Sequence, residues 1–250
     1  MNKPIKLFLI MAVILTSYST NMFAQNMNIA TVNVGNRGFY DDSGLKQGSS
    51  YEIMNRIVKE AGFSYNNDFM PFARIVTYLE TGEVDLALLV PNDIVNKVAI
   101  PLLHIQNVDF IIVGRKGFQF DRLEDIEGKK VGFLRMSPTA NNVFKHLNVV
   151  KIQGGKYTRL IKMLIRNRID VIFGPKSSIL GALRELNYSA DNLLGPSLTI
   201  QKLEMHLVYS KKTADEKIIA KLISTAEQLK KENIIQDIVD KYDQSIQIVD

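Results

Sequence analysis

The segment Leu79–Pro91, LETGEVDLALLVP, decides the fold of this chain. It reads as the end of a helix, a tight turn at Gly82, an aspartate and a continuous apolar strand that stops at a proline. The same order of features returns in Leu164–Pro175, LIRNRIDVIFGP. Strands that are apolar throughout are typical of parallel sheets covered by helices. The two segments therefore predict two α/β units of similar construction.

The residues around these two segments complete the units. In the first unit, Ile29–Val34 predicts a strand that runs into a Gly-Asn-Arg-Gly loop, where a ligand has room to lie. The apolar spacing then predicts one helix from Ser50 to Gly62 and, almost at once, a second helix that ends at Gly82. In the second unit, Val131–Leu134 predicts a strand and Ser137-Pro138 the start of a helix. Strand, helix, helix and strand in this order favour parallel pairing.

Two further apolar stretches, Val108–Val113 and Leu203–Tyr209, predict strands that cross between the two units. We therefore expect a lobe of residues 25–107 plus 206–250 and a second lobe of residues 108–205. Helical periodicity at 216–229 and 234–242 closes the chain. In such α/β lobes the carboxyl ends of the strands direct their loops at a shared cleft, where ligands bind.

Residues 1–24 predict a cleaved secretory signal peptide, and hence an exported, periplasmic protein. Lys3 and Lys6 precede the apolar run Leu7–Leu15, and small and polar residues follow. This run is about half of the roughly 20 residues that a membrane-spanning helix needs. An uncleaved anchor is the alternative interpretation.

Composition narrows the possible chemistry. The chain has a formal net charge of +5, and its basic residues are interspersed with acidic ones, which argues against nucleic-acid binding. It contains no cysteine, and its three histidines lack the spacing of metal ligands, so we expect neither a disulfide framework nor a metal site. No serine lies in a Gly-x-Ser-x-Gly motif. Nothing in the sequence requires an enzyme.

The segment Leu123–Gly132, LEDIEGKKVG, together with the two Asp-containing strand starts, resembles the family-three extracellular solute-binding proteins of bacterial transporters. The resemblance extends from about Ile29 to Tyr242. It implies the type II periplasmic-binding fold, in which two α/β lobes joined by two crossover strands close around one small solute. It further implies a monomer without cofactor that delivers an amino acid or a related amine or carboxylate to a membrane permease.

Several residues are candidates for contacting that solute. Ser137 and Thr139 lie at a helix start, where free N–H groups suit a carboxylate, although plain helix capping is the alternative. Arg74 lies at the start of another helix, where a cation is disfavoured, so either the solute or a nearby acid accounts for it. Phe72 and Tyr40 are candidates for an aromatic wall, against the alternative that they pack in the core.

Two loops depart from the amino-acid-binding pattern. Amino-acid binders usually carry an arginine after the first repeated strand and an acid after the second. This chain has Pro91–Asn96 in the first place and Gly174-Pro175-Lys176 in the second. We therefore doubt that the solute is a standard α-amino acid. Asn92 and Lys176 are candidates for contacts to another polar ligand.

Three functions fit these observations. The leading hypothesis is an exported solute-binding protein of a transporter. The alternative is a periplasmic ligand-sensing partner of a membrane signalling protein. A periplasmic dehydratase-like enzyme on the same fold is a third and weaker hypothesis, because it requires a proton-transfer group in the cleft.

Overall fold

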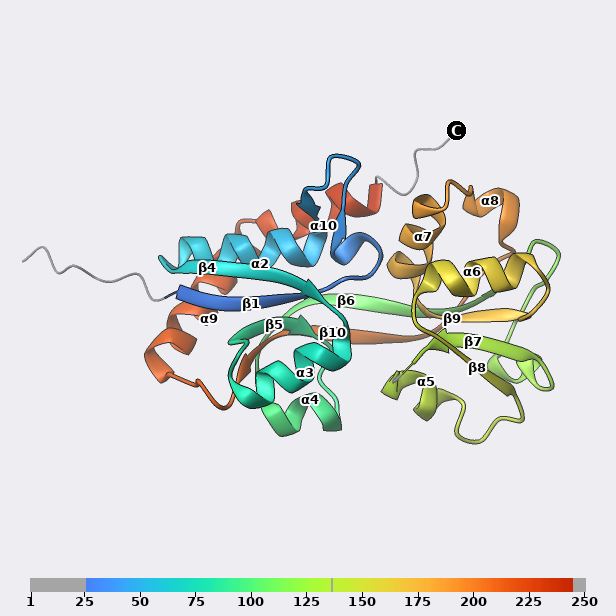
Figure 1. The fold of residues 1–250 in the computed structure, drawn as a ribbon, viewed down its shortest axis with the longest axis horizontal. Helices are drawn as coiled ribbons and strands as arrows, with labels where there is room; N and C mark the ends of the chain where they lie inside the picture. The colour runs from blue at the N-terminus through green and yellow to red at the C-terminus, as the bar shows by residue number, and fades with distance from the viewer. Residues whose placement is uncertain (1–25, 136, 245–250) are drawn as a thin grey trace, which may run out of the picture.

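The computed structural model describes residues 26–135 and 137–244, so the predicted signal peptide lies outside the described residues. The described chain forms a mixed sheet of eight strands with helices on both faces (Figure 1). The strands of this sheet are β1 (Asn26–Val32), β4 (Ser64–Met70), β5 (Leu86–Leu89), β6 (Ala99–Gly114), β7 (Lys130–Leu134), β8 (Val150–Gly154), β9 (Val171–Pro175) and β10 (Leu198–Ser210). A separate hairpin consists of β2 (Phe39–Tyr40) and β3 (Lys46–Gln47).

The helices are α2 (Ser49–Glu60), α3 (Phe72–Thr81), α4 (Asp93–Val98), α5 (Pro138–Val143), α6 (Tyr157–Ile165), α7 (Lys176–Glu185), α8 (Ala190–Leu193), α9 (Glu216–Lys231) and α10 (Ile234–Gln244). Two short 3-10 helices are η1 (Gly35–Arg37) and η2 (Leu123–Ile126). Among the described residues, no helix has the length and apolar character that crossing a membrane requires.

The strand order is β4-β1-β5-β10-β6-β9-β7-β8. The outer groups, β4-β1-β5 and β9-β7-β8, are parallel, whereas the central β10 and β6 pair antiparallel with each other and with the outer groups. Figure 1 shows β6 and β10 running through both halves of the molecule. The predicted fold class, two α/β lobes joined by two crossover strands, is therefore confirmed. The crossover strands are longer than predicted, and they unite both groups in one sheet.

The exact lobe boundaries stay a prediction. The expected breaks, at 107/108 and 205/206, fall inside β6 and β10. The pairing of these two strands shifts register between Met205 and His206. A register irregularity is where a strand bends most readily.

The strand register places the carboxyl ends of the two parallel groups opposite each other. The last residue of β5, Leu89, pairs with His206, which in turn pairs with His104 of β6. The last residue of β9, Pro175, pairs with Phe110 of β6. Because β5 and β9 run in opposite directions, their carboxyl ends point toward each other. The residues of β6 between the two pairings span about 20 Å.

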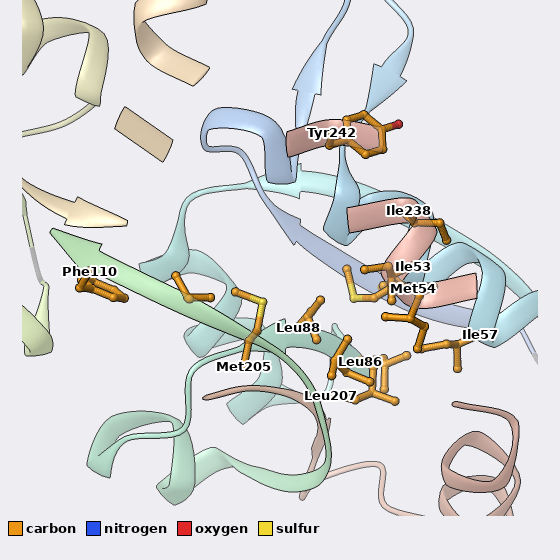
Figure 2. Packing of buried hydrophobic residues seen from close by; sticks show 14 of the residues in the cluster. Ile53, Met54, Ile57, Leu86, Leu88, Phe110, Met205, Leu207, Ile238 and Tyr242 are labelled. Carbon is orange, nitrogen blue, oxygen red and sulfur yellow. The ribbon is translucent and has the colours of Figure 1, made fainter. Parts of the chain in front are cut away.

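The core of the first lobe lies between the sheet and the helices α2 and α10. Figure 2 shows Ile53, Met54 and Ile57 of α2 facing Leu86 and Leu88 of β5. The three helix residues are completely buried, as the apolar spacing predicted. Burying such a side chain contributes about 1.5–3 kcal/mol. The packing of α2 therefore fixes this helix on the sheet and leaves the strand ends free to carry polar loops.

The internal repeat has a structural basis in its two aspartates. Asp85 Oδ2 accepts a hydrogen bond from the backbone N–H of Asn28 at 2.8 Å. Asp170 Oδ2 accepts one from the backbone N–H of Lys130, also at 2.8 Å. Each aspartate thus holds the first part of the neighbouring parallel strand, β1 or β7. The repeated aspartate is a strand clamp at the amino ends of the sheet.

One part of the predicted order was wrong, because β4 lies between α2 and α3. Its sequence, SYNNDFM, lacks the apolar run of a buried strand, and its residues alternate between exposed and less exposed positions. The strand lies at the edge of the sheet and pairs only with β1 among the described strands. Its buried Asn67 is held by side chains, since its Oδ1 accepts from Thr31 Oγ1 at 2.8 Å. A polar interior of this kind leaves no hydrophobic signal in the sequence.

Candidate ligand-binding site

The loops at the facing strand ends carry the candidate binding residues. In α/β sheets, ligands bind outside the carboxyl ends of the strands. Here η1, α3 and α4 follow β1, β4 and β5 in one lobe, and α5, α6 and α7 follow β7, β8 and β9 in the other. The candidate site therefore lies between these two sets of loops.

The predicted residues of the first lobe lie on three of its loops. Phe72 is the first residue of α3 and packs partly buried against the core under that helix, whereas Arg74 is exposed. Asn92 caps α4, since its Oδ1 accepts from the N–H groups of Ile94 at 3.0 Å and Val95 at 3.2 Å. Tyr40 is 54% exposed on the hairpin and contacts the edge of the Phe69 ring.

In the second lobe, Ser137 caps α5, because its Oγ accepts from the N–H of Ala140 at 3.2 Å. Thr139 is partly buried in the first turn of the same helix, and Lys176 is exposed as the first residue of α7. The structure thus gives Ser137 and Asn92 structural roles at helix starts. Their contact with a ligand, like that of the other predicted residues, stays a prediction.

The structure brings together a second group of polar residues at the contact between the lobes, where η1 packs against α7. We call this group the interlobe polar cluster; it consists of Asn36, Arg37, Tyr157, Lys176, Ser178 and Asp243. Asn36 Nδ2 donates to the backbone oxygen of Tyr242 and to Asp243 Oδ1, both at 3.2 Å. The cluster therefore joins residues from η1, α6, α7 and the end of α10.

Glycines allow the lobes to approach so closely. A Cβ atom at Gly181 of α7 would lie 2.6 Å from the Cα of Gly35 in η1, and one at Gly35 would lie 2.5 Å from the Cα of Ser178. Gly35 also has a φ of +53°, which favours glycine. Within the second lobe, a Cβ atom at Gly174 would lie 1.9 Å from the hydroxyl oxygen of Tyr157, so this glycine makes room for the tyrosine. The absence of side chains at these positions lets the polar groups of both lobes meet.

Burial perturbs the charged and hydroxyl groups of the cluster. Burial lowers the pKa of Arg37 to about 10, although Tyr157 and Asp243 partly oppose this shift. Burial raises the pKa of Tyr157 above its ordinary value, while the nearby charge of Arg37 lowers it. The Tyr157 hydroxyl therefore remains protonated at neutral pH and is available as a hydrogen-bond donor.

Asp243 is the acidic member of the cluster. Burial raises the pKa of its carboxyl group, and the neighbouring Asp240 raises it further. Arg37, Lys176 and the hydrogen bond from Asn36 act in the opposite direction. None of the ion pairs within 4.0 Å among the described residues involves Arg37 or Lys176. Asp243 thus interacts with these cations without forming a close pair with either of them.

Three buried polar atoms of the cluster have no hydrogen-bond partner among the described residues: Asn36 Oδ1, Arg37 Nη2 and Ser178 Oγ. Asn36 is 2% exposed and Ser178 is fully buried. Native proteins pair most buried polar groups, and each unpaired one costs about 1–3 kcal/mol. The contact between the lobes therefore contains unused hydrogen-bonding capacity from both sides.

Sequence reasoning missed Arg37, Tyr157 and Ser178. It placed a ligand near the Gly-Asn-Arg-Gly loop but did not single out the arginine, although the flanking glycines are a signal of close backbone approach. Tyr157 and Ser178 gave no signal, because only the fold brings the starts of α6 and α7 up to η1.

A hollow of about 340 Å³ lies elsewhere, on the outer face of the first lobe, and is lined by Glu52, Asn55, Arg56, Lys59, Tyr65, Ile234, Asp237, Ile238 and Lys241. These residues come from α2, β4 and α10, away from the strand ends. Its cations are mostly paired, as in Lys241 with Glu52 at 2.7 Å and Arg56 with Glu60. We therefore favour the interlobe region over this hollow as the binding site.

His104 and His206 lie side by side on β6 and β10, with ring centres 5.7 Å apart. Their separation in sequence concealed this proximity. Within residues 26–135 and 137–244, no three histidine, cysteine, aspartate or glutamate side chains gather as a metal site would require.

No protein-family model and no curated protein matches the chain. Solved structures do resemble it. A mutant of ArgBP from T. maritima shares 18% identity, with a TM-score of 0.74 over 88% of this chain and 95% of that one. A histidine kinase sensor domain with similarity to periplasmic binding proteins has 16% identity and a TM-score of 0.73, covering 88% of this chain and 97% of the other.

The substrate-binding protein of an amino acid ABC transporter is similar to the same degree, at 16% identity and a TM-score of 0.73, over 87% of this chain and 98% of that protein. Such likeness spans nearly the whole described chain. The chain therefore has the two-lobed α/β fold of the periplasmic binding proteins.

Proposed function

We propose that the chain is an exported solute-binding protein of the family-three type, which captures a small polar solute between its lobes and delivers it to a membrane transporter. The observation that carries this proposal is the pair of opposed strand ends, with polar side chains from both lobes meeting between them. The similarity to the substrate-binding protein of an amino acid ABC transporter supports it. The predicted signal peptide and periplasmic location belong to the same proposal.

The proposed mechanism is binding without chemical conversion. A solute that contacts both lobes binds the closed arrangement more tightly than the open one, and therefore shifts the population toward closure. The crossover strands β6 and β10 connect the lobes and are the elements that must bend. The three solved structures compared above are named as binding proteins or as a sensor domain, which supports a non-catalytic role.

Thermal-shift measurements with the purified protein test this function. The panel contains amino acids, polyamines, di- and tricarboxylates and sugars. A solute that binds only the folded protein must raise its melting temperature, by an amount that grows with solute concentration. A complete lack of stabilisation across the panel would argue against solute binding.

The predicted site residues are tested with the solute found in this screen. Arg74→Ala and Ser137→Ala should abolish the shift while leaving the protein folded, if both side chains contact the solute. Loss of the Ser137 cap alone costs about 1 kcal/mol of stability, so the melting temperature without solute must be measured for each variant. Unchanged solute affinity in both variants would remove these residues from the site.

A second candidate function is that of a periplasmic ligand-sensing partner of a membrane signalling protein. The similarity to a histidine kinase sensor domain supports it. Affinity capture from membrane extract distinguishes the two. Recovery of a permease favours transport, and recovery of a sensor kinase favours sensing.

A further inference from the structure

We propose that the solute bound between the lobes is an anion, and that the guanidinium group of Arg37 binds its carboxylate or phosphate oxygens. This inference rests on the proposed function, because it assumes that a solute binds between the lobes. It goes beyond that function by assigning the charge of the solute and the residue that recognises it.

The first argument is the unused donor of Arg37. Its Nη2 atom is buried and has no hydrogen-bond partner among the described residues. A guanidinium group has five N–H donors in a planar fork that matches the two oxygens of a carboxylate or phosphate. Arg37 retains partial exposure as a residue, so it borders the lobe contact and is not sealed in the core. An entering oxyanion would therefore satisfy a donor that the protein leaves unpaired.

The second argument is the charge around Arg37. Lys176, the exposed first residue of α7, interacts with the same carboxyl group as Arg37 does. Among the described members of the cluster, Asp243 is the one acid beside these two cations, and Asp240 is a further acid near it. The cluster as defined, with two cations and one acid, has a formal charge of +1, which favours an anionic over a cationic solute.

The third argument is the set of donors on the second lobe. Neither α6 nor α7 has an acidic residue in its first turn or a side-chain cap, so their first N–H groups and positive dipole ends remain available. In the first turn of α7, the fully buried Ser178 has an unpartnered Oγ. The protonated hydroxyl of Tyr157 at the start of α6 adds a further donor. An anion at Arg37 would thus meet donors from both lobes and favour closure.

The experiment measures dissociation constants by calorimetry with the purified protein and defined probes. The anionic probes are succinate, citrate, inorganic phosphate and glycerol phosphate; glutamine, arginine and a sugar represent neutral and cationic solutes. The best probe is then titrated into Arg37→Gln, Arg37→Lys and the control Arg168→Gln. Arg168 is exposed in the turn that leads to the amino end of β9, opposite to the end that faces the cluster.

We expect an anionic probe to bind. Arg37→Gln should then weaken its affinity about 10- to 100-fold, as expected for the loss of a hydrogen bond to a charged group. Arg37→Lys, which keeps the charge but loses the fork, should show a smaller loss, and Arg168→Gln should bind within about threefold of the natural protein. The succinate and phosphate arms show whether the oxyanion is a carboxylate or a phosphate.

Two results would overturn this inference and leave the proposed function standing. Binding of only a neutral or cationic probe would keep the solute-binding function and exclude the anion. Binding of an anion with the same affinity by Arg37→Gln and Arg168→Gln would exclude Arg37. If no probe of any charge binds, the proposed function itself fails. Melting curves of each variant without solute confirm folding, and Arg37→Lys carries the test if Arg37→Gln does not fold.

Discussion

At the residue scale, Asp85 and Asp170 show what the internal repeat accomplishes. Each carboxylate accepts a backbone N–H of the neighbouring parallel strand at 2.8 Å. The backbone N–H of each aspartate also donates a hydrogen bond to the backbone oxygen of the same partner residue. Asp85 N donates to Asn28 O, and Asp170 N donates to Lys130 O. The repeated aspartate is thus a property of how each lobe fastens its sheet.

We predict that Asp85→Ala and Asp170→Ala each lower the free energy of unfolding by about 1–2 kcal/mol. This lies at or just below the low end of the range for hydrogen bonds to charged groups, because both residues are partly exposed. Asp85→Asn should lose less, since the amide oxygen still accepts the bond. Urea unfolding measures the change. Asp42→Ala, at an exposed position, is the control. Unaltered stability of both alanine variants would contradict the clamp.

At the element scale, the start of the second lobe is organised by Asp125 of η2. Its Oδ2 accepts the backbone N–H groups of Asp121 at 2.9 Å and Arg122 at 3.0 Å. These backbone hydrogen bonds lower the pKa of Asp125 below its ordinary value of 3.8. The segment that carried the family resemblance in the sequence therefore also contains a carboxylate that is stabilised by backbone N–H groups.

This shift has a defined consequence for stability. A carboxyl group whose pKa is lowered by folding stabilises the folded protein above its unfolded-state pKa, and this stabilisation is lost as the pH falls through the folded-state pKa. We predict that Asp125→Asn melts below the natural protein at pH 7 and that the difference shrinks below about pH 3.8. Glu124→Gln is the exposed neighbouring control. A difference that does not change with pH would contradict this role.

The elements also show how far sequence reasoning reaches. The strands β5 and β9 were predictable because they are continuous apolar runs, and α2 and α3 because their apolar residues recur on one face. Strand β4 was not, because its buried Asn67 is satisfied by side-chain hydrogen bonds in place of apolar packing. The interlobe polar cluster was not predictable either, since its members come from four elements that only the tertiary fold assembles.

At the scale of the whole molecule, one sheet runs through both lobes, so lobe motion must bend its central strands. Besides the shift at Met205/His206, the pairing of β10 with β6 is irregular at Thr199/Gln201 and Leu207/Val208. Irregular pairing weakens the ladder locally and permits bending. The other determinant of closure is the contact of η1 with α7, where Gly181 lies against Gly35. The molecule thus combines an irregularly paired centre with a close backbone contact between the lobes.

We predict that Gly181→Ala prevents full closure. The added Cβ atom would lie 2.6 Å from Gly35 Cα and 2.9 Å from Asn36 N. Because both are backbone atoms that cannot rotate away, the lobes must separate. Alanine is favoured over glycine within a helix by about 1 kcal/mol, so α7 itself should not be weakened. Any loss of binding therefore arises from the lobe contact and not from unfolding of the helix.

Small-angle X-ray scattering and calorimetry with the solute identified by screening test this prediction. The natural protein should become more compact when solute is added, whereas Gly181→Ala should keep a larger radius of gyration and bind more weakly. The control is Gly155→Ala, whose Cβ atom would have no neighbour within 4 Å. If Gly181→Ala compacts and binds as the natural protein does, the contact of η1 with α7 does not define the closed state. The same contact brings Arg37 up to α6 and α7. That result would therefore also show that recognition of an anion by Arg37 does not depend on this contact.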